Sequence, residues 1–348
     1  MAPVQLTVFA RSDVGRVRAN NEDAFTVTDL DTGDRLDGAT APSRLDVQQR
    51  GILLLVSDGM GGHAAGEVAS ALVVDSLRKS LGESGADTSS MQRLVDNAVR
   101  RANADVWEAA KATRKQGMGA TLTAVLVHQT VAYVAAVGDS RAYLMRSGRI
   151  RQITKDQSFV QMLVDAGAIT PEEAKNSPQK NIILQSMGRE KNVTVSIGRL
   201  SLRRGDRLLV CSDGLSNLVN DDELADFLNR PDVSAAANGM IEMANERGGD
   251  DNVTAIVAEL DGEGLKLPSS AERVTQTLEV LQEYGKIERS PKPPSEPAPA
   301  PPSKAPPPAT PPNAAATQDA SRPAWIYAVI AMLVLAVVAV IVRTLVLR

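Results

Sequence analysis

The first 261 residues alternate between short apolar runs and longer segments with apolar residues every three or four positions. Short runs of apolar and β-branched residues bounded by turn residues are typical of strands. Two longer segments, Ala64–Leu81 and Met91–Ala112, have the spacing of amphipathic helices. The predicted strands are Val4–Ala10, Ala24–Thr28, Ile52–Ser57, Thr121–His128, Val131–Val137, Arg141–Arg146, Val193–Leu200, Arg207–Ser212 and Val253–Leu260.

Short turns connect several of these strands. His128-Gln129-Thr130 separates two of them, and Ser147-Gly148 follows a third. Connections this short join antiparallel strands, because a parallel pair needs a crossover of a dozen residues or more. Adjacent helices and runs of hairpins therefore predict an α+β fold, with helices packed on antiparallel sheets.

Beyond residue 261 the composition changes. Residues 262–290 are predicted to be a short helical extension, because Ser269 and Glu272 have capping-box spacing and apolar residues share one face of a helix over Ser269–Tyr284. Residues 291–323 contain 13 of the 19 prolines. Such a segment neither pairs as a strand nor packs a core, so we predict an extended linker.

The last part of the chain is apolar. Ala324–Val342 has 19 residues without a charge, and as a helix of about 28 Å it matches the hydrocarbon thickness of a bilayer. Trp325, Tyr327 and Arg343 suit its interfaces, whereas a buried core helix is rarely apolar on every face. We therefore predict one transmembrane helix and a short tail, residues 343–348. Because the first residues lack the pattern of a signal peptide, the globular part is expected in the cytoplasm, at the cell membrane.

The charge and the rare residue types exclude several kinds of site. The 38 Lys and Arg against 42 Asp and Glu leave a net charge of −4, which provides no basic excess for nucleic acid. One cysteine, Cys211, and two histidines, His63 and His128, exclude cysteine-rich and three-histidine zinc centres. Acid–base and metal chemistry must therefore depend mainly on carboxylates.

Aspartates lie at the ends of predicted strands. Asp58, Asp139 and Asp213 each follow an apolar strand, and Asp251 lies just before another. Strand ends are rigid, so side chains placed there converge at little entropic cost. Convergent carboxylates repel one another unless a cation lies among them, and oxygen ligands favour Mg²⁺ or Mn²⁺. Two such ions about 3.5–4 Å apart are the usual centre for phosphoester hydrolysis.

Each of these motifs also has a purely structural interpretation. Asp-Gly is mainly a turn signal, and Asp251-Asn252 has the composition of an Asx-turn. Arg18 and Glu22 are four residues apart, which is the spacing of an ordinary ion pair on a helix surface. The pattern alone leaves these interpretations open.

Seven blocks of the sequence stand out between Leu6 and Leu260. They are VGRVRANNEDAF (14–25), LLLVSDGMGGHAAGE (53–67), GMGATLT (117–123), VGDSRAYL (137–144), ITKDQS (153–158), LLVCSDGL (208–215) and DDNVTAIV (250–257). Together, in this order and with this spacing, the blocks resemble the bacterial branch of the metal-dependent Ser/Thr protein phosphatases of type 2C. The resemblance implies that residues 1–261 form a phosphatase domain of two stacked antiparallel β-sheets flanked by helix pairs.

The resemblance also implies roles for individual residues. Asp58 would bridge two Mn²⁺ or Mg²⁺ ions, and the carbonyl of Gly59 would ligate one of them. Arg18 would bind the substrate phosphate, a role that the forked guanidinium suits. The other implied ligands are Asp213 and Asp251 at the second ion, Asp139 with Asp213 at a third, weaker ion, and Glu22 and Asp23 through bound water.

The implied reaction is in-line attack on phosphorus by a metal-bridging hydroxide, without a covalent phosphoenzyme. Cys211 offers no other route, because a cysteine phosphatase needs an arginine six positions on, where this chain has Asn217. The general acid stays unassigned, since Met60 and Gln157 stand where family members carry histidine, and His63 is predicted to be a loop or helix-entry residue rather than a substitute acid.

Two segments differ from the rest of the domain. Phe159–Gly188 matches the segment beside the active site that is variable in the family. We call it the flap, and we expect it to shape substrate choice. Residues 31–50 are predicted to be a polar surface insertion.

These features predict a protein phosphatase tethered to a membrane, acting on phosphorylated Ser/Thr proteins, with a membrane-bound Ser/Thr kinase and its targets as partners. The linker would favour such partners by effective concentration. A catalytically silent membrane adaptor is the alternative, motivated by the missing histidines and the linker, but no metal carboxylate is missing. Hydrolysis of a nucleotide is disfavoured because no GxxxxGK[ST] loop occurs.

Overall fold

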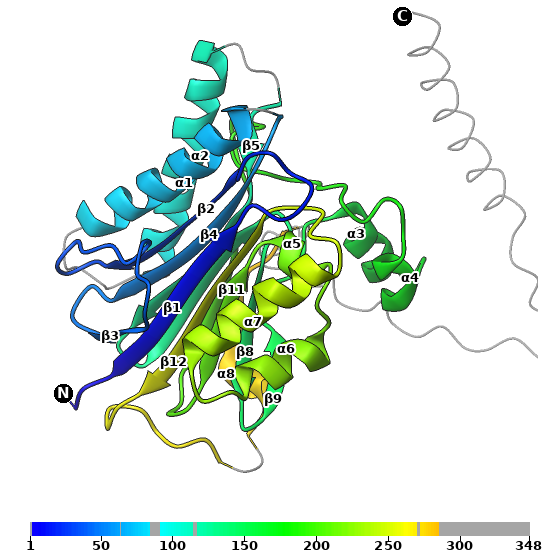
Figure 1. Cartoon of the computed structure of the whole chain (residues 1–348). Coiled ribbons are helices and arrows are strands. Elements are labelled where there is room, and N and C mark those ends of the chain that lie inside the picture. Colours follow the sequence, from blue (N-terminus) through cyan, green and yellow to red (C-terminus); the bar gives the residue numbers. More distant parts are fainter. Residues whose placement is uncertain (1, 63, 84–90, 114–116, 270–271, 285–348) are drawn as a thin grey trace, which may run out of the picture. The chain divides into compact units, whose positions relative to one another are not determined.

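Two antiparallel sheets stack face to face, and helices cover both outer faces, in the computed structural model (Figure 1). The chain divides into two units, Met1–Glu288 and Arg289–Arg348, and every described residue belongs to the first. The structure describes residues 2–62, 64–83, 91–113, 117–269 and 272–284.

Both sheets consist of antiparallel neighbours. The six-stranded sheet has the order β3 (Ser43–Asp46), β1 (Gln5–Asp13), β12 (Val253–Asp261), β11 (Arg207–Cys211), β8 (Arg141–Arg146) and β9 (Arg149–Gln152). The seven-stranded sheet has the order β13 (Leu278–Gln282), β10 (Ser196–Ser201), β7 (Val131–Val137), β6 (Leu122–His128), β4 (Ile52–Met60) and β2 (Asp23–Asp29), and β5 (Gly119–Ala120) pairs with β4.

The central strands are buried on both faces, which explains their unbroken apolar runs. In β4, Leu53 and Leu55 point to the helix-covered outer face, whereas Leu54 and Val56 point between the sheets. The middle layer is almost entirely aliphatic. Burying a side chain of this size stabilises a fold by about 1.5–3 kcal/mol, so the sandwich rigidly fixes the strand ends where the acidic residues lie.

Helices flank each sheet. The long helices α1 (Ala64–Glu83) and α2 (Met91–Thr113) pack on the seven-stranded sheet. The short α5 (Asp213–Ser216), with α6 (Asp221–Leu228) and α7 (Val233–Glu246), packs on the six-stranded sheet. The flap contains α3 (Phe159–Asp165) and α4 (Pro171–Lys175), and α8 (Val274–Thr277) precedes β13.

The structure confirms the predicted α+β fold, its hairpins and both long helices. It adds elements where we predicted none. β3 lies within the segment 31–50 and pairs with β1. Helices α5 to α7 lie between two predicted strands, and the strand predicted at Val193–Leu200 begins three residues later.

The helix predicted over Ser269–Tyr284 is wrong. Among the described residues of this range, 269 and 272–284, only one helical turn forms, and Leu278–Gln282 is a strand that pairs with β10. Val274 is buried between the sheets, and Leu281 packs on the other face of the seven-stranded sheet. The free edge of β10 therefore outweighs the helical spacing, since strand pairing satisfies its backbone groups and still buries these side chains.

Among the residues that the structure describes, no helix combines the length and apolar character needed to cross a bilayer. The transmembrane helix predicted at 324–342, the linker at 291–323 and the tail at 343–348 lie outside that part of the chain, as does His63.

Candidate active site

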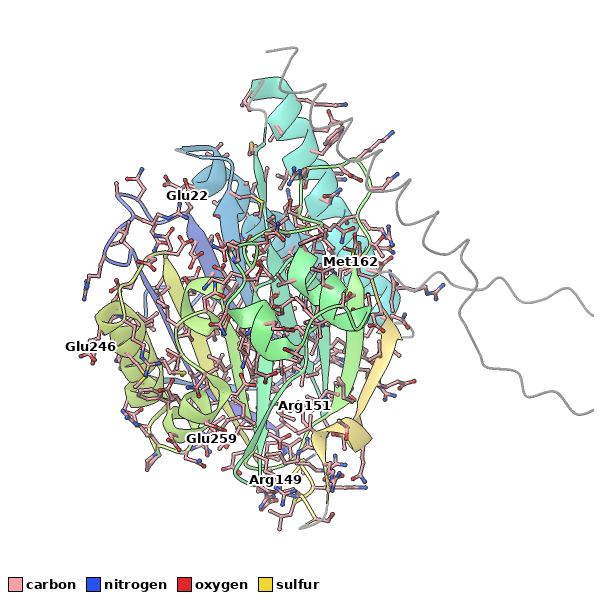
Figure 2. All side chains as sticks on the ribbon, turned by 90° about the vertical axis from the view of Figure 1, so that its right-hand side faces the viewer. Glu22, Arg149, Arg151, Met162, Glu246 and Glu259 are labelled. Carbon is pink, nitrogen blue, oxygen red and sulfur yellow. The ribbon has the colours of Figure 1, made fainter. Side chains whose placement is uncertain are left out.

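The predicted acidic residues meet at one edge of the two sheets. Asp58 lies near the end of β4, and Asp23 lies opposite it at the start of β2. Asp139 follows β7, Asp213 begins α5 directly after β11, and Asp251 lies two residues before β12. Figure 2 shows Glu22 near this end of the sandwich and Arg149 at the opposite end. We call Asp23, Asp58, Asp139, Asp213 and Asp251 the acidic cluster.

Burial and mutual repulsion define the electrostatics of the cluster. Burial raises the pKa of Asp58 well above its ordinary value, and the charges of Asp23, Asp213, Asp139 and Asp251 raise it further. Burial likewise raises the pKa of Asp23 to about 7. The pKa values of Asp139 and Asp213 are also raised, first by burial and then by neighbouring carboxylates. The fold therefore crowds negative charge where water cannot screen it.

The cluster has the donor set of a divalent metal centre. Asp23, Asp139 and Asp213 each have one buried carboxylate oxygen, Oδ1, without a hydrogen-bond partner in the described structure. Buried carboxylates without donors are costly unless a cation compensates them. Oxygen-only ligands select hard ions such as Mg²⁺ or Mn²⁺. Within the described ranges, no three acidic, histidine or cysteine side chains are grouped closely enough to hold an ion as they stand.

Hydroxyl groups fix the second oxygen of Asp23. Its Oδ2 accepts hydrogen bonds from Thr254 Oγ1 at 2.6 Å and from Ser212 Oγ at 2.8 Å. On β4, the backbone N–H of Asp58 donates to Thr121 Oγ1 at 2.9 Å. These hydroxyls come from three different strand ends, and they hold the Asp23 carboxylate and the backbone of Asp58 in place. The sequence analysis assigned them no role, although Ser212 and Thr254 lie inside blocks that carried the resemblance.

Asn252 connects the two ends of the chain at the site. Its Oδ1 accepts from the backbone N–H of Glu22 at 2.7 Å, and its Nδ2 donates to the carbonyls of Val14 and Asn20, both at 2.9 Å. All its amide groups are thus used in holding the loop between β1 and β2 against the segment that carries Asp251. This role was also not predicted, and its only sequence signal is the position next to an implied metal ligand.

Arg18 lies on that loop. Its Nη2 donates to Asp251 Oδ2 at 2.8 Å, and about half of its side chain is exposed. A guanidinium therefore lies at the solvent side of the acidic cluster, where it can bind an anion without being displaced from the fold. The sequence left open an ordinary ion pair between Arg18 and Glu22, four residues apart. In the structure, Arg18 contacts Asp251, which lies near the other end of the domain.

Gly59 is confined by close backbone contacts. Its N–H donates to the carbonyl of Glu22 at 3.1 Å, and a Cβ at this position would collide with Gly66 and Glu22 backbone atoms. The backbone of Gly59 is thus held against the segment carrying Glu22. Its carbonyl as a metal ligand stays a prediction.

A cavity of about 440 Å³ opens beside the cluster. Asp139 and Asp213 line it, and so do flap residues, among them Lys175 and Lys180. Neither lysine has a side-chain partner in the described part of the chain. Arg141 also lines the cavity, but its guanidinium donates to both carboxylate oxygens of Asp156 at 2.7–3.0 Å. The flap thus contributes unpaired positive charge to a cavity that reaches the acidic cluster.

Cys211 and Gln157 have no nucleophilic or acid role in this geometry. Burial raises the pKa of the Cys211 thiol to about 12, and the side chain packs in the outer core. Gln157 is buried, and its amide accepts from the N–H of Gly138 and donates to Ala136 and Ser196. At the position where family members were expected to carry histidine, Gln157 therefore links β7 to β10 through these hydrogen bonds.

Residues 16–258 match the family model described as Protein phosphatase 2C. The serine/threonine protein phosphatase PstP of Mycobacterium tuberculosis is 43% identical over 256 residues, which cover 72% of this chain and 44% of that protein. The chain therefore spans less than half of that relative. The serine/threonine phosphatase stp of Listeria monocytogenes is 35% identical over 255 residues, covering 72% of this chain and 94% of the relative.

Solved structures agree with these matches. The crystal structure of M. tuberculosis PstP/Ppp is 40% identical, with a TM-score of 0.63, and the match covers 74% of this chain and 99% of that one. The PstP catalytic domain in complex with two manganese ions is 39% identical, with a TM-score of 0.62 and the same coverage. The family model, the sequence relatives and the structures cover the same part of the molecule, so the chain belongs to the protein phosphatase 2C family.

Proposed function

We propose that the protein hydrolyses phosphoserine and phosphothreonine on other proteins, using Mn²⁺ or Mg²⁺ bound by the acidic cluster. The observation that carries this proposal is the convergence of five aspartates from distant strand ends, three with buried oxygens lacking donors, beside an exposed arginine. The named activities of the relatives and the two manganese ions in the PstP catalytic domain support it.

The residues of this chain divide the work. Asp58, Asp213, Asp251 and Asp139 would hold the ions, with Asp23 and Glu22 contributing through water. When bound, two such ions lower the pKa of water and stabilise charge on phosphoryl oxygens.

Arg18 binds the phosphate oxygens through its forked donors. The hydroxyls of Ser212 and Thr254 hold Asp23 in place, and Asn252 holds the loop that carries Arg18. The reacting groups are thereby oriented before substrate binds.

Phosphate release from a phosphothreonine peptide by the full-length protein, with and without Mn²⁺, tests the proposal. We expect Mn²⁺-dependent release that falls by at least about 100-fold in Asp213→Asn, because one lost carboxylate weakens both ion binding and charge stabilisation. Asp226→Asn is the matched control, since Asp226 is an exposed aspartate on α6. Equal activity in both variants would falsify the proposed centre.

The same assay judges the alternatives. A silent adaptor would release no phosphate and would bind no Mn²⁺ in calorimetry. A nucleotide or small-molecule phosphoesterase would prefer those esters to the phosphopeptide in competition. The retention of every implied metal carboxylate favours the phosphatase over the adaptor.

We also propose that the protein is a single-pass protein of the cell membrane with its catalytic domain in the cytoplasm, where it opposes a membrane-bound Ser/Thr kinase. The support is the uncharged segment Ala324–Val342 and the proline-rich linker before it. Membrane fractionation of the full-length protein and of a variant ending at residue 323 tests this. We expect only the full-length protein in the membrane fraction, and equal distribution of both would contradict the anchor.

A further inference from the structure

After β12 the described part of the chain returns to the edge of the seven-stranded sheet, and its last described residues lie beside the flap. We call residues 272–284 the C-terminal extension. It lies beyond the family match, which ends at residue 258, yet β13 pairs with β10 through four residues of the seven-stranded sheet. A cavity of about 710 Å³ separates its last residues, Glu283 and Tyr284, from the flap. In Figure 2, Met162 marks flap helix α3 on the face turned to the viewer, and it lines this cavity.

One lysine joins the flap to the extension. Lys155 Nζ lies 2.8 Å from Asp165 Oδ2, at the end of α3, and 3.0 Å from Glu283 Oε1. The Glu283 side chain is only 16% exposed, whereas Lys155 is 44% exposed. Asp165 and Glu283 are far apart in sequence, and the ammonium group lies between them as a shared counter-ion.

A second connection runs from the extension to the acidic cluster. The N–H of Tyr284 donates to Ser196 Oγ at 3.1 Å, and the same oxygen accepts from Gln157 Nε2 at 3.1 Å. Gln157 Oε1 in turn accepts from the N–H of Gly138 at 3.0 Å, directly before Asp139. These hydrogen bonds hold the end of the C-terminal extension in place relative to Asp139. Glu283, the residue before Tyr284, therefore provides Lys155 with a fixed carboxylate partner.

Resting on the phosphatase function proposed above, we propose that Lys155 is a positioning residue. Together with Glu283, it holds the flap beside the 440 Å³ cavity that reaches the acidic cluster. The flap residues Lys175 and Lys180 line the cavity that reaches Asp139 and Asp213. The position of the flap therefore determines how the cavity contacts the peptide on either side of the phosphorylated residue. The phosphate itself binds at Arg18 and the acidic cluster. The C-terminal extension thus contributes to substrate recognition through the flap.

An ordinary surface ion pair would stabilise the fold without affecting recognition, so the test must separate the two. We measure KM and kcat of the full-length protein for a phosphothreonine peptide and for p-nitrophenyl phosphate, which is too small to reach the flap. In Lys155→Met and Glu283→Gln we expect KM for the peptide to rise about two- to fivefold, the scale of a partly exposed ion pair. The constants for p-nitrophenyl phosphate stay unchanged, and Lys155→Arg restores the peptide KM.

Glu279→Gln is the matched control, because Glu279 lies on β13, four residues before Glu283, and forms an exposed ion pair with Arg199 on the neighbouring strand β10. An unchanged peptide KM in the Lys155 and Glu283 variants, or an equal rise in Glu279→Gln, overturns the proposal. So does an equal effect on both esters.

Hydrogen exchange of the flap gives a readout independent of activity. We expect faster exchange across Phe159–Gly188 in Glu283→Gln and not in Glu279→Gln, because only the first change frees α3. Unchanged exchange overturns the positioning role. If the wild-type protein releases phosphate from neither ester, the proposed phosphatase function fails, and the exchange result alone still decides whether Lys155 holds the flap.

Discussion

Arg18 and Asp251 are 233 positions apart in sequence, yet the guanidinium of one donates to the carboxylate of the other at 2.8 Å. The pair joins the loop after β1 to the segment before β12, which are neighbouring strands of one sheet. Both side chains remain accessible to solvent. The contact therefore holds the guanidinium that we propose binds phosphate at the solvent side of the acidic cluster.

Replacement of Arg18 should affect catalysis and leave folding almost unchanged. In Arg18→Ala we expect kcat/KM for a phosphopeptide to fall about 10- to 100-fold, the loss of a charge-assisted hydrogen bond. Stability should change by less than about 1 kcal/mol, because the ion pair is exposed. Initial rates and thermal unfolding measure both. Arg16→Ala, an exposed arginine two residues earlier, is the control, and an equal loss of activity there would contradict the specific role of Arg18.

Asp213→Asn should stabilise the metal-free protein, because it removes one charge from a buried cluster of like charges. The variant should lose most of the stabilisation that Mn²⁺ gives the wild-type protein, which is about 2.7 kcal/mol when free Mn²⁺ is about 100 times its Kd. Thermal unfolding in EDTA and in Mn²⁺ provides both values. A lower melting temperature in EDTA than that of the wild-type protein would count against electrostatic strain in the cluster.

Metal-free protein should lose stability as the pH rises from about 4 to 7. The pKa of Asp23 is about 7 in the folded protein and about 3.9 in an unfolded chain. The folded state therefore binds more protons in this window, and the free energy of unfolding falls as the pH increases, because the carboxyl ionises more readily in the unfolded chain. Urea unfolding in EDTA across this range measures the slope, which should be shallower in Asp23→Asn. An identical slope in that variant would show that Asp23 does not titrate in this way.

The buried pair of Arg146 and Asp206 should be the most sensitive electrostatic contact outside the site. Their side chains are 1% and 0% exposed, and Arg146 also donates to Thr277 of α8 at 2.7 Å. Asp206→Asn should reduce the free energy of unfolding by about 3–5 kcal/mol, because it leaves a buried guanidinium charge whose remaining counter-ion, Glu272, is 3.9 Å away. Urea unfolding at pH 7 tests this, with the exposed pair partner Glu279→Gln as the comparison. If both variants lost the same small amount of unfolding free energy, the buried pair would be no more sensitive than the exposed one.

Strands with two buried faces were predictable from sequence, and the extension was not. β4 and β11 are continuous apolar runs because their side chains alternate between two cores. Leu278 and Leu281 share the spacing of a helix face, but the unpaired edge of β10 determines their conformation. That edge is created by tertiary structure, so it cannot be predicted from a local sequence pattern.

The site shows the same division. Asp58, Asp139 and Asp213 were predictable because each directly follows an apolar strand, and hairpins bring strand ends together. Asn252 and Ser212 were not, because their roles depend on hydrogen bonds to Asn20 and Asp23 from distant parts of the chain. The proposed metal ligands were visible in the sequence, whereas the residues that orient them required coordinates.

The pairing of β13 with β10 also determines where the protein can be shortened. A fragment ending at the last residue of the family match, 258, would expose the N–H and C=O groups of β10 that β13 now satisfies. A bare sheet border of this kind recruits strands from other molecules. Such a fragment would be prone to self-association, and any shortened version of this protein should retain the residues through Tyr284.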